Sequence, residues 1–259
     1  MLLSTSDHYP LGLLARRLKR VNPLSDQDVQ AIEGLPVTVR ELVAGQDIVR
    51  EGDRPSQSCF VLDGWAYSYK LIEEGRRQIL AFHLRGELPD LLDLRMGVAD
   101  FSVCALTKVT VAFIPHEALC VLTSRHPALA VALWHLTLVE AAALRERITG
   151  LGRRPANERL AHLFCELHAR QSALALATKG ECSLPMTQTD LADALGMTSV
   201  HVNRSLRELR GNGLVTLKGR RLSIHDWRGL ASLAGFHPSY LHLDTLEPTH
   251  ESQSLSPAE

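Results

Sequence analysis

The sequence of 259 residues lacks the signature motifs of several protein classes. Its five cysteines are widely spaced and form no CxxC pair, so we expect neither structural disulfides nor a structural zinc site. It contains no GxSxG elbow, HExxH pair, Walker loop or dinucleotide fingerprint. We therefore predict that the protein is not an enzyme and that it holds no metal site.

Long apolar runs are also lacking. No apolar run approaches the roughly 18 residues that are needed to cross a bilayer. The N-terminus does not resemble a signal peptide, because Asp7 precedes a short apolar stretch that ends in a basic cluster. Hydrophobic residues make up 45% of the chain and charged residues 22%, a balance that allows a sizeable core. We expect a cytoplasmic protein without a membrane partner.

The formal net charge of −1 conceals an uneven distribution along the chain. Residues 151–230 carry 12 Lys and Arg against 7 Asp and Glu, whereas residues 231–259 carry none against 4. A basic segment followed by an acidic tail favours a polyanionic partner for that segment alone.

Periodicity divides the first 150 residues into three parts. The first 35 residues indicate short helices, with Leu11, Leu14 and Leu18 on one face and a helix start at Ser25. Residues 37–114 contain short apolar or alternating runs separated by glycines, which is typical of antiparallel strands in a sandwich or barrel. Residues 127–150 indicate one long helix that begins at Pro127.

The apolar residues of this long helix form more than one stripe, so two of its sides must be covered. The second cover is either another copy of the chain or the core of the same chain, and the pattern leaves both open. Gly150 and Gly152 predict the end of the helix, and residues 150–154 a hinge. Beyond the hinge we predict a helix to about residue 172, a loop, two short helices, a hairpin over residues 214–224 and a last helix after Asp226. The tail from about Pro238 is expected to be disordered.

The two short helices form a helix-turn-helix pattern. Leu191, Ala192 and Leu195 give the first helix a buried face, and Gly196 allows the sharp turn that follows. Thr198 can cap the second helix.

Polar residues are left on the outward face of this second helix, near its N-terminus. An arginine there can bind guanine O6 and N7 in the major groove of double-stranded DNA. The hairpin has a basic tip that can contact phosphates. The residues predicted to bind DNA are Thr187, Gln188, Thr198, Ser199, Val200, His201, Asn203, Arg204, Arg207, Lys218 and Arg220.

The helix-turn-helix and hairpin resemble the winged-helix domain of Crp/Fnr transcription regulators. GQDIVREGD at residues 45–53, FVLDG at 60–64 and RGEL at 85–88 resemble the cyclic-nucleotide-binding β-roll of that family. The resemblance covers roughly residues 12–235 and implies an α+β fold. It implies a jelly-roll-like β-roll sensor domain (1–126), a dimerisation helix and hinge (127–152), a winged helix-turn-helix domain (153–236) and an acidic tail (237–259).

The family's base-reading positions correspond to Ser199, Val200, Asn203 and Arg204. Arg204 keeps the family arginine, whereas Val200 stands where many members have a glutamate. The operator of those members therefore does not transfer to this chain. The resemblance also implies a homodimer on an inverted-repeat operator, and RNA polymerase as a further partner of an activator.

The resemblance places an effector pocket at Gly86, Glu87, Asp100 and Ser102. Ala99 or Asp100 falls near the arginine that neutralises a cyclic phosphate, so cyclic-nucleotide binding is not expected. Glu87, Asp90 and Asp93 are expected in a solvated loop.

No cofactor is predicted. Haem remains open, with His83, His116 and the cysteines as candidate ligands. The sensed signal remains open too. The alternative function is a cyclic-nucleotide- or haem-responsive module that acts on a protein partner.

Overall fold

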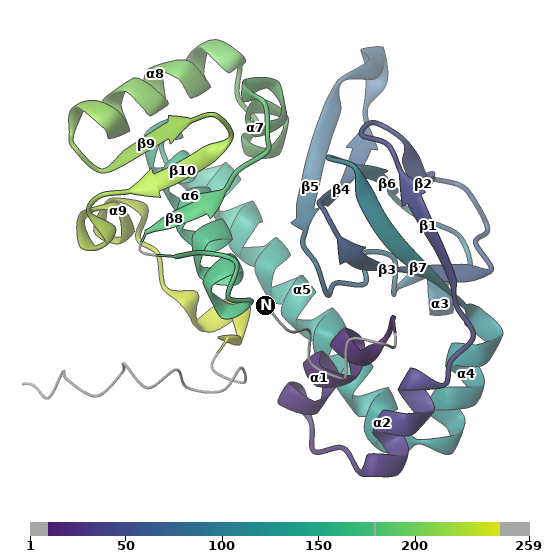
Figure 1. Ribbon diagram of the computed structural model, residues 1–259. Helices are drawn as coiled ribbons and strands as arrows, with labels where there is room; N and C mark the ends of the chain where they lie inside the picture. Colours follow the sequence, from purple (N-terminus) through teal and green to yellow (C-terminus); the bar gives the residue numbers. More distant parts are fainter. Residues whose placement is uncertain (1–9, 179, 244–259) are drawn as a thin grey trace, which may run out of the picture.

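The computed structural model describes residues 10–178 and 180–243. Figure 1 shows a β-roll on one side, a helical module with a small sheet on the other, and a long helix that passes between them. The predicted α+β architecture is confirmed.

Two short helices precede the β-roll, α1 (Gly12–Val21) and α2 (Asp26–Glu33). α1 buries Leu14 and Leu18, as its apolar spacing predicts. α2 begins at a capping box in which the Ser25 hydroxyl accepts from the Asp28 backbone N–H and the Asp28 carboxylate accepts from the Ser25 backbone N–H.

The β-roll consists of two antiparallel sheets packed face to face, with strand orders β1-β7-β3 and β2-β6-β4-β5. Val61, Val103 and Val111 are fully buried between them. A single turn η2 (Glu73–Gly75) joins β4 to β5, and the short helix α3 (Asp93–Met96) precedes β6. The strands are β1 (Thr38–Leu42), β2 (Asp47–Val49), β3 (Gln57–Asp63), β4 (Ala66–Leu71), β5 (Arg77–His83), β6 (Ser102–Ala105) and β7 (Val109–Pro115).

The β-roll leads through α4 (His116–Arg125) into α5 (Pro127–Arg153), which has Pro127 in its first turn as predicted. The predicted stop at the glycines is wrong, because Gly150 and Gly152 lie inside the helix. The chain leaves the helix at Arg154, whose backbone is extended, since a residue before proline avoids the helical region.

Much of the apolar surface of α5 is open to solvent. By length and composition alone α5 is long and apolar enough to cross a membrane, and only 17% of its most apolar stretch is buried. The expectation that no segment is long and apolar enough is therefore wrong. One such helix is weak evidence for a span, because the core helix of a soluble protein passes the same test.

The C-terminal module (residues 156–234) has four helices and a three-stranded sheet of order β8-β10-β9. The third strand, β8, lies in the segment expected to be a loop, where Cys182 pairs with Leu222. The elements of this module are α6 (Ala156–Ala173), β8 (Glu181–Ser183), α7 (Gln188–Leu195), α8 (Ser199–Gly211), β9 (Val215–Lys218), β10 (Arg221–Ile224) and α9 (Trp227–Ala234).

The chain continues past α9 into the short turn η3 (Pro238–Leu241), which packs against α5. Leu241 is buried, and the Tyr240 hydroxyl donates to Oε2 of Glu166 over 2.9 Å. The predicted disorder from Pro238 is therefore wrong for residues 238–243, because an aromatic and an apolar side chain fix this segment. The acidic end of the predicted tail lies outside the described residues.

Candidate nucleic-acid interface

Local side-chain chemistry sets the geometry of α7 and α8. α7 begins with a capping box in which the Thr187 backbone N–H donates to Asp190 over 2.9 Å and Asp190 N–H donates back to the Thr187 hydroxyl over 3.1 Å. α7 ends at Gly196, whose φ of +58° is left-handed. α8 then begins with Thr198, whose hydroxyl accepts from the His201 backbone N–H over 3.3 Å.

This geometry presents one face of α8 to solvent. Val202 and Leu209 are buried beneath it, whereas Val200 on the outer face is 76% exposed. Asn203 is half-buried, and its amide donates to Oε1 of Gln188 on α7 over 3.4 Å. The other residues predicted to bind DNA are exposed, namely Thr187, Gln188, Thr198, Ser199, His201, Arg204, Arg207, Lys218 and Arg220.

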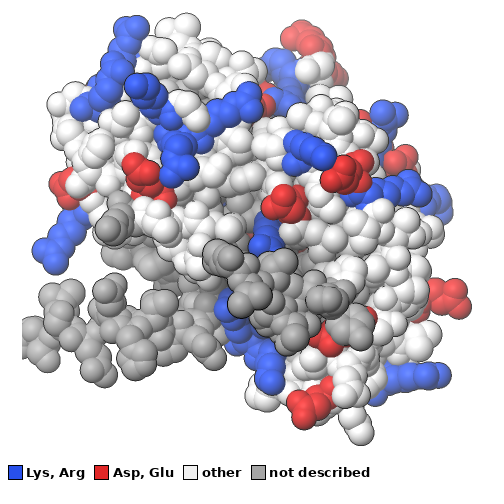
Figure 2. Space-filling model, viewed as in Figure 1, with Lys and Arg blue, Asp and Glu red and all other residues white. Residues whose placement is uncertain are grey.

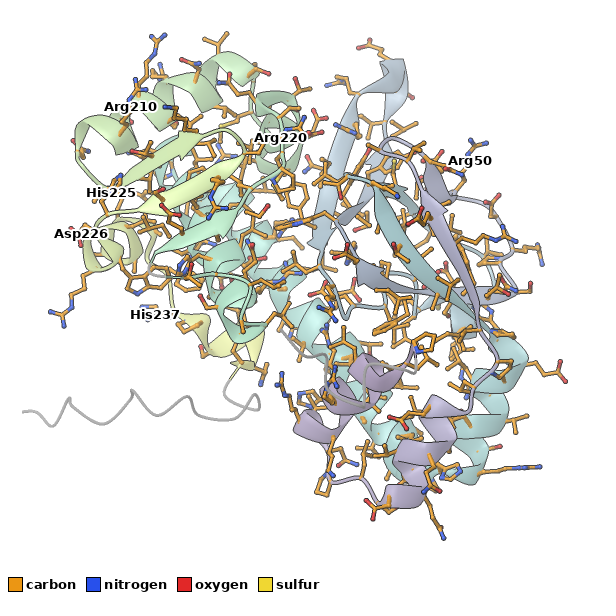
Figure 3. The ribbon with its side chains drawn as sticks, viewed as in Figure 1. Arg50, Arg210, Arg220, His225, Asp226 and His237 are labelled. Atoms are coloured by element: carbon orange, nitrogen blue, oxygen red, sulfur yellow. The ribbon has the colours of Figure 1, made fainter. Side chains whose placement is uncertain are left out.

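The β9–β10 hairpin turns within two residues, Gly219 and Arg220, both with positive φ, because Lys218 pairs directly with Arg221. The Arg220 side chain is therefore carried at the tip of the hairpin, as Figure 3 shows. In Figure 2, Lys and Arg side chains gather at the upper edge of the molecule over the C-terminal module. The hairpin and α8 thus form one basic surface.

Arg210 belongs to this surface but was missed in the sequence. It is exposed in the last turn of α8, one turn after Arg207. Both arginines line a hollow of about 290 Å³ together with Gln188, Asn203 and Leu217. The spacing of three residues between the two arginines was the available signal, since residues three apart share a helix face.

The turn between α7 and α8 gives a prediction about stability. Gly196→Ala is expected to lower the free energy of unfolding by about 1–2 kcal/mol, because an L-residue resists the left-handed conformation. The added Cβ would also lie 3.3 Å from Cδ2 of Leu151. Gly211→Ala is the matched control, since its Cβ meets open space without positive φ. Urea unfolding of the two variants checks this, and an equal effect of both would contradict it.

The residues predicted for an effector pocket lie in two places. Glu87 lies beside the C-terminal module, where both its oxygens accept from Nη2 of Arg170 over 2.8 and 2.9 Å. Arg17 of α1 donates to the Gly86 carbonyl over 2.7 Å and lies 3.7 Å from Glu87. Burial alone would raise the pKa of Glu87, but the charges of Arg170 and Arg17 together with the hydrogen bond from His83 outweigh burial and hold that pKa well below its usual range.

Asp100 and Ser102 are directed elsewhere. Asp100 is exposed, and its backbone carbonyl accepts from Nζ of Lys70. The Ser102 hydroxyl accepts from the Glu51 backbone N–H over 2.9 Å. Neither lines the cavities that Glu87 lines, so the four residues do not come together in one of those cavities.

The prediction that the acidic residues near Glu87 lie in a solvated loop is wrong, because Asp90 and Asp93 are buried. Both oxygens of Asp90 accept from the Cys59 backbone N–H, over 2.8 and 2.9 Å. Burial raises the pKa of Asp90 to about 8 and that of Asp93 to about 6. The Asp90 carboxyl therefore supports β3 through the Cys59 backbone, whereas neither oxygen of Asp93 has a hydrogen-bond partner among the described residues.

The candidate haem ligands occupy different settings. His83 is buried, with Nδ1 3.5 Å from Glu87 and no hydrogen-bond partner for Nε2 among the described residues. His116 pairs with the Ser58 hydroxyl over 3.1 Å. Within residues 10–178 and 180–243, no three His, Cys, Asp or Glu residues are grouped so that they could hold a metal ion.

Comparison with known proteins covers both halves of the chain. A family model described as a Crp-like helix-turn-helix domain matches residues 158–233, and one described as a cyclic nucleotide-binding domain matches residues 39–126. Transcriptional activator protein FnrA of Stutzerimonas stutzeri is 29% identical over 212 residues, 82% of this chain and 86% of that protein. The fumarate and nitrate reduction regulatory protein of Escherichia coli K12 is 27% identical over 82% of this chain and 84% of its own length.

Solved structures agree with these matches. The structure of FixK2 from Bradyrhizobium japonicum has a TM-score of 0.70 and 29% identity, and the match covers 77% of this chain and 98% of FixK2. A CRP-family regulator from Thermus thermophilus, at 19% identity and a TM-score of 0.59, shares the fold.

Proposed function

Because the chain belongs to the Crp/Fnr family of transcriptional regulators, we propose that it binds an inverted-repeat DNA operator as a homodimer and does so without a cyclic nucleotide. The observation that carries the proposal is the exposed face of α8, held on a capped helix-turn-helix beside a basic hairpin. α8 enters the major groove, and the hairpin rests on the phosphate backbone.

Base recognition is assigned to the first turns of α8. Arg204 is exposed and can donate two hydrogen bonds to guanine O6 and N7. Val200 offers an apolar side chain that fits a thymine methyl group. Ser199 and Asn203 contact base edges or phosphates beside them. Lys218, Arg220 and the Arg207–Arg210 pair bind phosphates, which adds affinity without sequence preference.

An exposed apolar stripe on α5, here called the seam, supports the homodimer. Its most exposed apolar members are Val131 (50%), Trp134 (64%), Leu138 (50%) and Ile148 (69%). Together with Ala141 and the charged Arg145, these residues alternate in steps of three and four, the spacing with which two helices pack in a coiled coil. Two-fold packing along the seam gives half-sites about one helical turn apart, roughly 34–36 Å.

The surroundings of Glu87 support the absence of cyclic-nucleotide control. Arg170 of the chain itself binds both oxygens of Glu87, so this carboxylate is already occupied by an internal partner. As a regulator the protein acts in the cytoplasm, and as an activator it would also contact RNA polymerase.

Selection from random DNA duplexes without added ligand tests the proposal. An inverted repeat should be enriched, and Arg204→Ala should weaken binding to it by about 1–3 kcal/mol. Arg228→Ala is the matched control, because this exposed arginine lies on α9, away from the α8 face. Salt-sensitive binding without an enriched sequence would contradict the proposal, as would equal effects of the two substitutions. Binding that appears only with cyclic AMP or haem would favour the ligand-responsive alternative.

A further inference from the structure

α7 of the helix-turn-helix lies against β5 of the β-roll, as Figure 1 shows. A single β-roll arginine connects them. Nε of Arg77 donates to Asp193 over 2.8 Å, and Nη2 donates to Asp190 over 2.7 Å. Nη1 of the same guanidinium donates to the Tyr67 hydroxyl over 2.7 Å, which anchors it to β4. All three guanidinium nitrogens of Arg77 thus donate a hydrogen bond at this junction.

One further hydrogen bond crosses the junction at the end of α7. The Gln78 side-chain amide of β5 donates to the Ala194 carbonyl over 3.4 Å. Within the C-terminal module itself, Arg159 of α6 donates to the Leu195 carbonyl over 2.7 Å. These are among the last carbonyls of α7, which have no partner within their own helix. Neighbouring side chains from β5 and α6 therefore hold the end of α7 that leads into the turn at Gly196.

The C-terminal module is also held at a second, separate place. Arg170 of α6 donates to Glu87 and to the Phe82 carbonyl, and Arg147 of α5 donates to Glu166 over 3.2 Å and to the Leu80 carbonyl over 2.7 Å. This second attachment holds α6, whereas the attachment through Arg77 holds α7. Two attachments on different helices fix orientation as well as distance, whereas a single one would leave a pivot.

The docked arrangement leaves the functional surfaces open. Asp190, Asp193 and the Ala194 carbonyl take part in docking, and none of them belongs to the outer face of α8. Arg204 stays exposed on that face, and Leu138 stays exposed on the seam of α5. An inhibitory contact would cover the DNA-reading face or the dimer seam, and this junction covers neither.

We propose that Arg77 is a positioning residue for DNA recognition: by binding Asp190 and Asp193 it sets the orientation of α7 and α8 on the β-roll, and so the spacing of the two α8 helices in the dimer, with no effector bound. This inference rests on the proposed function. In this proposal the ion pairs of Arg77 with Asp190 and Asp193 hold the helix-turn-helix in its DNA-binding orientation, as a bound ligand does in a ligand-controlled regulator.

Charge reversal at Arg77 and Asp193 tests the inference. Asp193 is chosen because Asp190 also caps α7, so its replacement would disturb the helix itself. Arg77→Glu and Asp193→Arg are each expected to weaken binding to the full inverted repeat by about fivefold or more, the scale of a typical coupling between sites. Binding to a single half-site should not change, because each α8 is intact. The double variant R77E/D193R should recover affinity for the full repeat.

A series of operators with altered half-site spacing gives a second measurement. The wild-type protein should prefer one spacing, and Arg77→Ala should flatten that preference. Equal losses on half-site and full repeat would indicate a folding defect and overturn the inference, as would an unchanged spacing profile. Tighter binding by Arg77→Ala would identify an inhibitory contact, which also overturns it. Failure of the wild-type protein to bind any inverted repeat would instead contradict the proposed function.

Discussion

Leu138→Glu is expected to convert the proposed homodimer to a monomer at micromolar concentration. Leu138 lies in the middle of the seam on α5 and is 50% exposed, so it has little packing to lose within one chain. In a two-fold interface each substitution occurs twice. If each buried anchor contributes about 2 kcal/mol, the dissociation constant of the dimer should rise roughly a thousandfold.

Sedimentation equilibrium measures the dimer, and binding to full and half operators measures the consequence. Leu138→Glu should lose affinity for the full repeat while keeping its affinity for a half-site. Val121→Glu is the matched control, because Val121 is 44% exposed on α4 and lies outside the seam. A dimer that survives Leu138→Glu would contradict the assignment of the seam. Circular dichroism of the variant checks that the monomer remains folded.

Arg170→Met is expected to lower the free energy of unfolding at neutral pH by about 3 kcal/mol, because it leaves a buried carboxylate without its main cation. Glu87 and Glu166 are largely buried, and Arg170 lies within 2.8 and 3.3 Å of them. The expected loss is at the lower end for a broken buried pair, because Arg17 still lies 3.7 Å from Glu87 and Arg147 lies 3.2 Å from Glu166.

The effect of Arg170→Met should depend on pH with a definite sign. The folded-state pKa of Glu87 lies below its unfolded value, so its stabilising contribution is complete above the unfolded pKa and is lost as pH falls through the folded pKa. Without Arg170, burial dominates and raises that pKa, so protonation of Glu87 at lower pH raises the unfolding free energy of the variant. The difference in unfolding free energy between wild type and variant should therefore shrink from pH 7 to pH 5.

Chemical denaturation at the two pH values measures this difference. The double variant E87Q/R170M is the matched control, because a neutral amide removes the unpaired charge while keeping the shape of the side chain. It should be more stable than Arg170→Met at pH 7. A variant that is as stable as wild type at both pH values would contradict the role given to this ion pair.

Features that depend on neighbouring residues were predictable from the sequence. Gly196 and Thr198 each act within one helical turn, so they predict the turn after the first helix and the start of the second. The short runs of the β-roll and the start of α5 at Pro127 follow from the same local preferences. The exposed face of α8 also follows, because its buried residues Val202 and Leu209 identify the opposite side.

Local preference was insufficient where packing opposed it. Gly150 and Gly152 predicted the end of α5, but each glycine costs a helix only about 1 kcal/mol, which tertiary contacts can offset. Gly150 is buried in the structure, and α5 ends at Arg153, two residues before Pro155. The sequence predicted that residues 238–243 belong to a disordered tail. In the structure this segment packs against α5 and α6, and the Tyr240 hydroxyl donates to Glu166 of α6.

The sequence by itself therefore determined the order of the β-roll, the long helix and the helix-turn-helix, and the face of α8 proposed to meet DNA, but it did not determine β8 or η3. Only the tertiary structure decided which charges meet, because Arg77 and Asp190 are 113 residues apart, and Arg170 and Glu87 are 83 apart. A charged side chain in a sequence has many possible partners and is most often solvated. Burial makes a partner necessary, and folding determines which residue becomes that partner.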